Sequence, residues 1–220
     1  GGFVFLLIVL AVSITLLASF LLSKTILRGV PSAFVLELPP YRRPKLGEVI
    51  VRSMLDRTIF VLARAVTVAI PAGAVIWLCQ NIMVNGHTLL YGMATLLEPL
   101  GACMGLSGVI LMAFLLGIPA NEIVIPILLM VYSQSGTLVE AEGIAQAGAI
   151  LAANGWTWVT AVCVILFSLN HFPCATTLLT IRKETGSLLW TGVSFLLPTV
   201  VGMLLCIAVH LLALLVGIFF

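Results

Sequence analysis

Two long runs without Asp, Glu, Lys or Arg limit the fold of this chain more than any other feature. They extend from Phe3 to Ser23 and from Leu188 to Phe220. A transmembrane helix needs about 20 consecutive apolar residues. Of all residues, 62% are hydrophobic and 8% are charged, whereas a soluble domain has about 25% charged residues. The sequence therefore predicts an all-α, polytopic helical membrane protein.

The basic residues divide the chain into three predicted parts. Residues 1–23 form a transmembrane helix. Residues 24–64 hold eight of the ten Lys and Arg, and we expect a loop followed by an amphipathic helix at the membrane interface. The positive-inside rule places this segment in the cytoplasm. Residues 65–220 form a membrane domain of about four or five spanning or re-entrant helices.

The course of the chain through residues 65–220 leaves alternatives open. Thr88–Gly105 is either a re-entrant hairpin or a short span, and Ser133–Gly155 is expected to be a polar connection. Arg182–Ser187 is expected to be a charged turn on the cytoplasmic side, which requires an even number of crossings after Arg64. Leu188–Phe220 is too long for one straight span, so it either bends at Pro198 or ends along the interface.

Glu122 is the most unusual residue of the apolar region, in the segment "GIPANEIVIP". A carboxylate at membrane depth costs several kcal/mol unless it is paired, so such residues usually serve a function. Pro119 breaks the helix and frees backbone carbonyls, and Asn121 adds another oxygen. These residues predict an ion pathway with a gating break, or else a glutamate that pairs with an arginine or caps a half-helix.

A second helix break lies in the segment "SLNHFPCATT". Asn170, His171 and Cys174 supply an amide, an imidazole and a thiol, and Pro173 breaks the helix between them. Together with a carboxylate, these groups suit a divalent transition metal better than Mg²⁺ or Ca²⁺. The alternative is that Cys174 is a packed small side chain and His171 an interior histidine with satisfied hydrogen bonds.

The remaining sulfur-containing side chains carry weaker signals. Cys103 and Met104 stand between glycines and are secondary candidates for soft ligands of an ion. The other three cysteines lie in apolar runs outside any CxxC pair, which favours packing over a disulfide framework; they are Cys79, Cys163 and Cys206. No phosphate-binding GxxxxGK[ST] segment and no GxGxxG segment occurs in the sequence.

Three separated motifs resemble one known family. They are "FVLELPPYRRP" (Phe34–Pro44), "GIPANEIVIP" (Gly117–Pro126) and "FPCATTLLTIRKETGS" (Phe172–Ser187). In this order and spacing they resemble the C-terminal membrane half, the second gate region, of the ferrous-iron transport protein B (FeoB) family. The resemblance covers nearly the whole chain.

The resemblance implies a gate-type half of an Fe²⁺ transporter in the prokaryotic cytoplasmic (inner) membrane, with Fe²⁺ as the transported substrate. The family's Pro-Cys pair falls on Pro173 and Cys174, and its membrane glutamate falls on Glu122. GTP and Mg²⁺ would act only through an N-terminal G domain. That domain and the first gate half are not in this chain, so we expect them elsewhere on the same polypeptide or on a separate chain.

The same resemblance implies further expectations about partners. The chain itself is not expected to be an enzyme; it contacts lipid, can form homo-oligomers and binds no nucleic acid. It departs from the family at two positions. Many members have Lys where this chain has Asn121, which removes a salt-bridge partner of Glu122, and many lack a histidine at the position of His171.

Other function classes remain open from the residues alone. A gate-family transporter of nucleosides or another small polar solute would use amide, carboxylate and hydroxyl groups at half-helix ends. An intramembrane hydrolase using Cys174 and His171 would need an orienting group and an oxyanion donor that the sequence does not indicate. The last alternative is a structural membrane subunit that assembles with a partner chain.

Overall fold

The computed structural model describes residues 2–25, 47, 51, 55, 58–84, 86–133 and 143–217. The chain forms two compact units, Gly1–Arg64 and Ala65–Phe220. The predicted loop and most of the predicted amphipathic helix at residues 24–64 lie outside the described residues. The domain boundaries derived from the sequence stay a prediction.

The first unit contains one long described helix, α1 (Gly2–Thr25). Two of its polar side chains form hydrogen bonds to the helix backbone: Ser13 donates to the carbonyl of Val9 at 2.8 Å, and Thr15 to that of Ala11 at 2.9 Å. These bonds satisfy the hydroxyl groups within the helix itself. The helix can therefore place them in an apolar environment.

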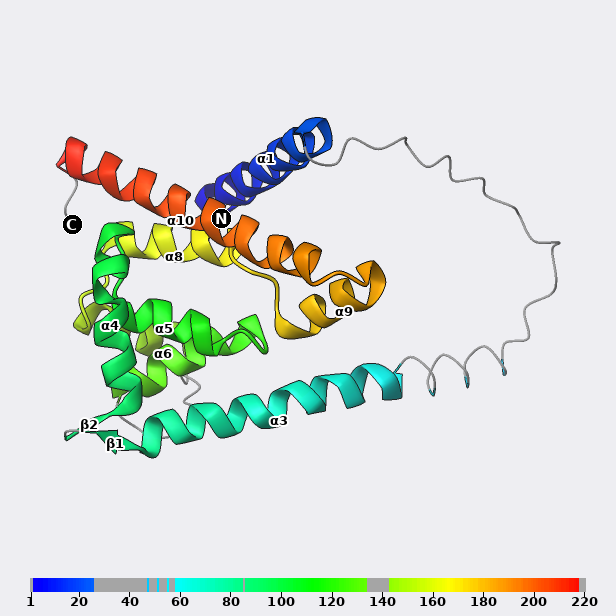
Figure 1. Ribbon diagram of the computed structural model, residues 1–220. Coiled ribbons are helices and arrows are strands. Elements are labelled where there is room, and N and C mark those ends of the chain that lie inside the picture. The colour runs from blue at the N-terminus through cyan, green and yellow to red at the C-terminus, as the bar shows by residue number, and fades with distance from the viewer. Residues whose placement is uncertain are drawn as a thin grey trace. The chain divides into compact units, whose positions relative to one another are not determined.

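Helices make up most of the described residues of the second unit, together with one short β-hairpin (Figure 1). Its strands β1 and β2 are antiparallel, with Met83 opposite Thr88. In chain order its elements are α3 (Phe60–Asn81, which begins before the unit boundary), β1 (Met83–Val84), β2 (His87–Thr88), α4 (Leu89–Cys103), α5 (Gly108–Leu116), η2 (Asn121–Ile123), α6 (Val124–Ser133), α7 (Ile144–Ala153), α8 (Trp158–Asn170), α9 (Ala175–Thr185) and α10 (Leu188–Val216).

The described helices confirm the prediction of a helical membrane protein. Within the part of the chain that the structure describes, four segments can cross a membrane by length and composition: Val4–Thr25, Val61–Asn81, Trp158–Thr185 and Leu188–Val216. A fifth apolar unit is the pair α4 and α5, between which the chain bends by 112°, so that they form either a broken span or a re-entrant loop. Both alternatives drawn from the sequence for Thr88–Gly105 are therefore still open.

The elbow between α4 and α5 depends on two glycines. Gly105 has a φ of +70°, in the left-handed region that side chains with a Cβ rarely adopt. Gly108 begins α5, and a Cβ there would overlap the carbonyl of Ala94 on α4. The backbones of the two helices can therefore approach each other closely at this corner.

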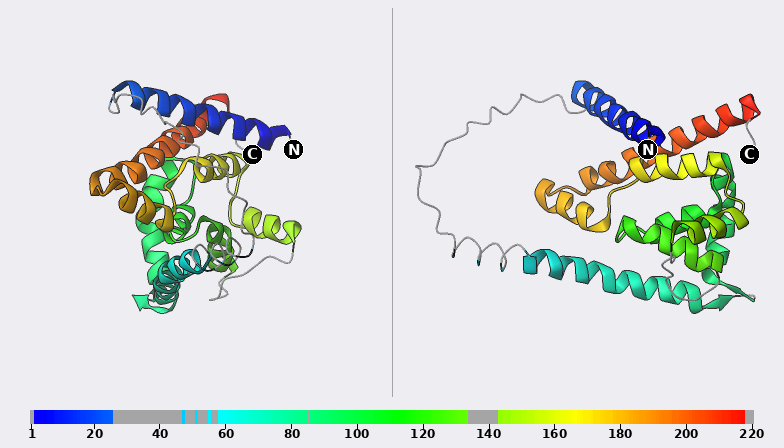
Figure 2. Two further views of the ribbon diagram at one scale, coloured as in Figure 1. Left: turned by 90° about the vertical axis from the view of Figure 1, so that its right-hand side faces the viewer. Right: turned by 180° about the vertical axis from the view of Figure 1, so that it is seen from behind.

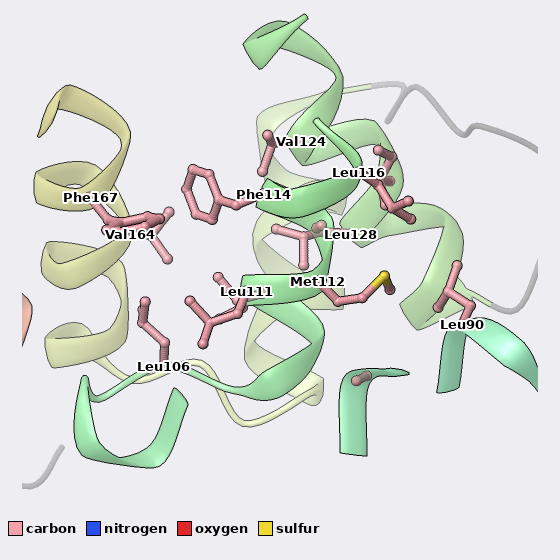
Figure 3. Packing of buried hydrophobic residues seen from close by; sticks show 14 of the residues in the cluster. Leu90, Leu106, Leu111, Met112, Phe114, Leu116, Val124, Leu128, Val164 and Phe167 are labelled. Atoms are coloured by element: carbon pink, nitrogen blue, oxygen red, sulfur yellow. The ribbon is translucent and has the colours of Figure 1, made fainter. Parts of the chain in front are cut away.

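The core of the second unit lies where α5 and α6 face α8 (Figure 3). Phe114 of α5 meets Phe167 of α8 edge to face, with 4.9 Å between the ring centroids. Met112 and Leu128 belong to the same cluster and are completely buried. Such interdigitated van der Waals packing is a main attraction between helices in lipid, so this layer holds α5, α6 and α8 together.

Helices α8 and α10 pack along a second contact. The thiol of Cys163 points to the carbonyl of Cys206 at 3.8 Å, and the thiol of Cys206 to the carbonyl of Cys163 at 3.3 Å. Both side chains are fully buried, and a Cβ at Gly202 would lie only 3.0 Å from the carbonyl oxygen of Asn170. These two cysteines, like Cys79, are buried, as the packing interpretation expects.

Two local predictions from the sequence were wrong. The expected polar connection Ser133–Gly155 contains α7, because its alanine-rich part has high helix propensity. The expected charged turn at Arg182–Ser187 is mostly helix, since α9 continues to Thr185. Basic side chains are favourable in a last helical turn, and Gly186 ends the helix in the left-handed conformation, which glycine adopts readily.

Candidate functional site

The two predicted helix breaks lie next to each other in the structure. After α5 the chain turns through Ile118 and Pro119 into the short helix η2, and Pro173 separates α8 from α9. The amide of Ala175, at the start of α9, donates to the carbonyl of Ile118 at 2.8 Å. Amides at helix starts and carbonyls at helix ends lack partners within their own helix. This bond supplies one partner to each and joins the two breaks.

A cavity of about 560 Å³ opens beside this junction. We call it the Cys174 cavity. Helix α3 forms one wall, the break before α6 forms another, and the start of α9 forms a third. Its lining residues are Ala65, Ala69, Ala72, Gly73, Ile76, Pro119, Ala120, Asn121, Glu122, Ile123, Cys174 and Thr176. The structure thus brings together Cys174 and Glu122, more than fifty positions apart in the sequence.

Cys174 holds the N-cap position of α9. Its sulfur lies 3.1 Å from the hydroxyl oxygen of Thr176 and 3.1 Å from that of Thr177. The positive end of the helix dipole favours negative charge at this position, and both hydroxyls are within hydrogen-bond distance of the sulfur. The half-buried thiol is therefore placed both to carry charge and to face the cavity.

Glu122 and Asn121 lie in the short helix η2, and both side chains are exposed at the cavity. Carboxylate, amide and thiol groups therefore surround one space. In the described part of the chain no three His, Cys, Asp or Glu residues are close enough to hold a metal ion. An ion in this cavity would need amide, hydroxyl, backbone or water oxygens as additional ligands, which is typical of a site that binds an ion only transiently.

The wall supplied by α3 was not identified from the sequence. Ala65, Ala69, Ala72 and Gly73 follow the spacing of one helix face, and their small side chains leave the cavity open. The pattern of small residues at every third or fourth position was visible in the sequence. Nothing local, however, indicated which helix would face the proline breaks.

Two other predicted residues lie outside the lining of this cavity. Asn170 is buried, and its side-chain amide donates to the carbonyl of Leu166 at 3.0 Å. In His171, Nδ1 lies 2.9 Å from the carbonyl oxygen of Ser168, and Nε2 is buried without a hydrogen-bond partner among the residues that the structure describes. The sequence could not separate these residues from Cys174, because all of them lie within five positions at the same helix break.

Aromatic rings surround the imidazole of His171. Its ring centroid lies 4.9 Å from that of Phe172, 5.3 Å from that of Phe114 and 5.9 Å from that of Phe167. The weaker candidates Cys103 and Met104 also lie away from the Cys174 cavity: the first is exposed and the second completely buried. Among the predicted ligands, the structure therefore groups Cys174, Glu122 and Asn121.

Comparison with family models gives two matches. Residues 4–57 match the model described as "Ferrous iron transport protein B C terminus". Residues 62–188, more than half of the chain, match the Gate model, which is described as "Nucleoside recognition". Both helix breaks and all residues that line the Cys174 cavity lie within the second match.

Curated proteins named "Fe(2+) transporter FeoB" are similar to most of the chain. A Staphylococcus aureus protein is 29% identical over 210 residues, which is 90% of this chain and 29% of the relative. One from Methanocaldococcus jannaschii is 26% identical over 80% of the chain and 27% of the relative. One from Synechocystis is 30% identical over 78% and 27%, respectively.

The chain thus spans less than a third of the length of these curated relatives. No solved structure matches it. The resemblance drawn from the three sequence motifs is confirmed by both the family models and the relatives.

Proposed function

We propose that this chain, which belongs to the Gate family described as nucleoside recognition, is the membrane part of a ferrous-iron transporter. The relatives named Fe(2+) transporter support iron as the substrate. The match of residues 4–57 to the C-terminal model of the same protein supports it as well. The matched models cover the transporting part of such a system.

The observation that carries this proposal is the grouping of Cys174, Glu122 and Asn121 around one cavity between two helix breaks. Thiolate, carboxylate and neutral oxygen ligands together suit a borderline metal such as Fe²⁺. The ion would exchange part of its water shell for these groups. Fe²⁺ binds more weakly than most later transition metals. A site with only a few protein ligands therefore holds it weakly enough for release.

The junction of the two breaks provides the moving part in this proposal. Pro119 and Pro173 interrupt the helical hydrogen bonds, and the bond from Ala175 to Ile118 replaces one of them across the gap. A shift of α9 relative to α5 would change this bond and the position of Cys174 together. The binding of the ion and the opening of the gate would then involve the same few residues.

The setting of the chain follows from the same proposal. It would lie in the prokaryotic cytoplasmic membrane, with residues 24–64 on the cytoplasmic side, since they carry most of the basic residues. A G domain on another part of the polypeptide or on another chain would bind GTP and Mg²⁺. The chain itself would act as a transporter part and not as an enzyme, and could form homo-oligomers.

A nucleoside is the second candidate substrate, and the description of the matched Gate model favours it. The cavity of about 560 Å³ is large enough for a small solute. A nucleoside would need hydrogen-bonding groups and would make little use of a thiol. Substrate competition distinguishes the two proposals.

The test is Fe²⁺ uptake by the complete transport system in proteoliposomes under anaerobic conditions. We expect Glu122→Ala and Cys174→Ser each to reduce uptake by about tenfold or more, equivalent to at least about 1.4 kcal/mol, because each removes a ligand. Matched controls are Glu184→Gln and Cys103→Ser, which change an exposed carboxylate and an exposed thiol away from the cavity. Parental uptake in both cavity variants would refute the site, and transport of a nucleoside without iron would refute the substrate.

A further inference from the structure

A second cavity lies at the other end of α5 and α8, the helices that end beside the Cys174 cavity. It has a volume of about 280 Å³, and we call it the His210 cavity. It is formed by the elbow between α4 and α5, the loop before α8 and the last third of α10. The lining residues are Glu98, Ala102, Gly105, Leu106, Ser107, Ile110, Asn154, Gly155, Trp156, Thr157, Val159, Thr160, His210 and Ala213.

The carboxylate of Glu98 is fixed at the wall of this cavity. Its Oε2 accepts a hydrogen bond of 2.6 Å from the amide of Gly108, the first residue of α5. A carboxylate has two oxygens that accept several hydrogen bonds or ligands, so this bond leaves capacity for an ion. This hydrogen bond caps the start of α5. It therefore holds the carboxylate of Glu98 in place and leaves other lone pairs free for an ion.

The imidazole of His210 reaches the same cavity from α10. It lies against Gly105, where an added Cβ would be 2.7 Å from Nδ1. The glycine is thus required both by its positive φ and by the ring beside it. Four further lining residues have side chains with a neutral oxygen, namely Ser107, Asn154, Thr157 and Thr160.

Helices α5 and α8 connect the two cavities and run side by side (Figures 1 and 2). Ser107 and Thr157, the N-caps of α5 and α8, line the His210 cavity. The breaks that follow both helices line the Cys174 cavity. With a rise of 1.5 Å per residue, these helices extend over roughly 13–20 Å. The packed layer around Phe114 of α5 and Phe167 of α8 lies along these helices (Figure 3).

We propose that the His210 cavity is a second binding site for a hydrated divalent cation, with Glu98 and His210 as its protein ligands. Imidazole and carboxylate are a common ligand pair for Fe²⁺. Since one water occupies about 30 Å³ of liquid, the cavity has room for an ion that keeps part of its water shell. The inference rests on the proposed function for the identity of the ion, Fe²⁺, which would stop here before or after the apolar layer.

The first test is the number of Fe²⁺ ions bound by the complete protein in lipid nanodiscs, measured anaerobically with radioactive iron. We expect the double variant Glu98→Gln/His210→Gln to bind one ion fewer per chain than the parent. The amide that replaces the carboxylate of Glu98 keeps an oxygen that can accept from Gly108, so the variant removes the charge and preserves the cap. The matched control is Glu184→Gln/His87→Gln, which changes an exposed glutamate and an exposed histidine elsewhere.

Variants of the other cavity make the outcome specific. Cys174→Ser/Glu122→Ala should also lose one ion, and all four substitutions together should lose two. Parental binding by the Glu98/His210 variant would overturn this inference and leave the proposed function intact. Parental binding by the Cys174/Glu122 variant would instead contradict the site of the proposed function.

A spectroscopic readout keeps the test valid if the double variant folds poorly. Mn²⁺ bound to the Cys174→Ser/Glu122→Ala protein should show nitrogen coupling from an imidazole ligand in pulsed electron paramagnetic resonance. The single variant His210→Gln should remove this coupling. Coupling of unchanged strength in His210→Gln would overturn the assignment of His210 as a ligand.

Discussion

The two cavities lie at opposite ends of α5 and α8, and they are built by different kinds of backbone. Prolines open the Cys174 cavity by ending helices, and the carboxylate of Glu122 is exposed on a three-residue helix. Glycines shape the His210 cavity by letting helices touch, and the carboxylate of Glu98 holds the start of α5. The carboxylate of Glu122 is thus free to bind a ligand, whereas that of Glu98 also supports the fold.

This difference predicts which substitutions change the stability of the protein and which change transport. Substitutions at the glycine elbow should act mainly on folding, because backbone contacts fill that corner. Substitutions around the proline breaks should act mainly on the passage of the ion, because much of that wall is open. The following variants test the two halves of this comparison.

The largest expected effect is on stability, from Gly108→Ala. The added Cβ would overlap the carbonyl of Ala94 and lie 2.8 Å from Oε2 of Glu98, so it would separate α4 from α5 and break the cap. We expect a loss of about 3 kcal/mol, in the range of overpacked cores, or failure to fold. Thermal unfolding of the purified protein measures it.

The matched control for this variant is Gly92→Ala, which changes another glycine of the same helix pair. A Cβ at Gly92 meets nothing within 4 Å, and Ala is favoured over Gly inside a helix by about 0.5–1 kcal/mol. Its stability should be equal to or above that of the parent. If both variants unfold like the parent, the close contact at the elbow is wrong.

The position of Glu98 shows what the sequence could and could not predict. Its neighbour Pro99 suggests a break, yet α4 continues through both residues and ends at Cys103. The partner of Glu98 is the amide of Gly108, and His210 comes from α10, about a hundred positions away. No local pattern joins residues that only the folded helices bring together.

The helix breaks themselves were predictable because their cause is local. Proline removes a backbone donor wherever it stands, and a carboxylate in an apolar run indicates a function. These rules identified Pro119, Glu122, Pro173 and Cys174, all of which lie at or beside the breaks. They could not show that α3 would supply the facing wall of small residues.

That wall provides the second prediction, with an intermediate effect. Ala69→Leu should fill part of the Cys174 cavity and reduce Fe²⁺ uptake by about tenfold, or about 1.4 kcal/mol in the barrier, without lowering the melting temperature. The control Ala74→Leu lies on α3 outside the cavity lining, and should stay within about twofold. Equal uptake by both variants would show that the ion does not pass between α3 and the breaks.

The smallest expected effect concerns His171, which follows the end of α8 and lines neither cavity. Its ring packs among Phe114, Phe167 and Phe172, so His171→Phe keeps the shape of the cluster. It removes a buried Nε2 that has no partner within the described residues, and it loses the contact of Nδ1 with the carbonyl of Ser168. Since these changes oppose each other, Fe²⁺ uptake should stay within about twofold of the parent. A loss as large as that of Cys174→Ser would instead make the imidazole a ligand on the path between the cavities.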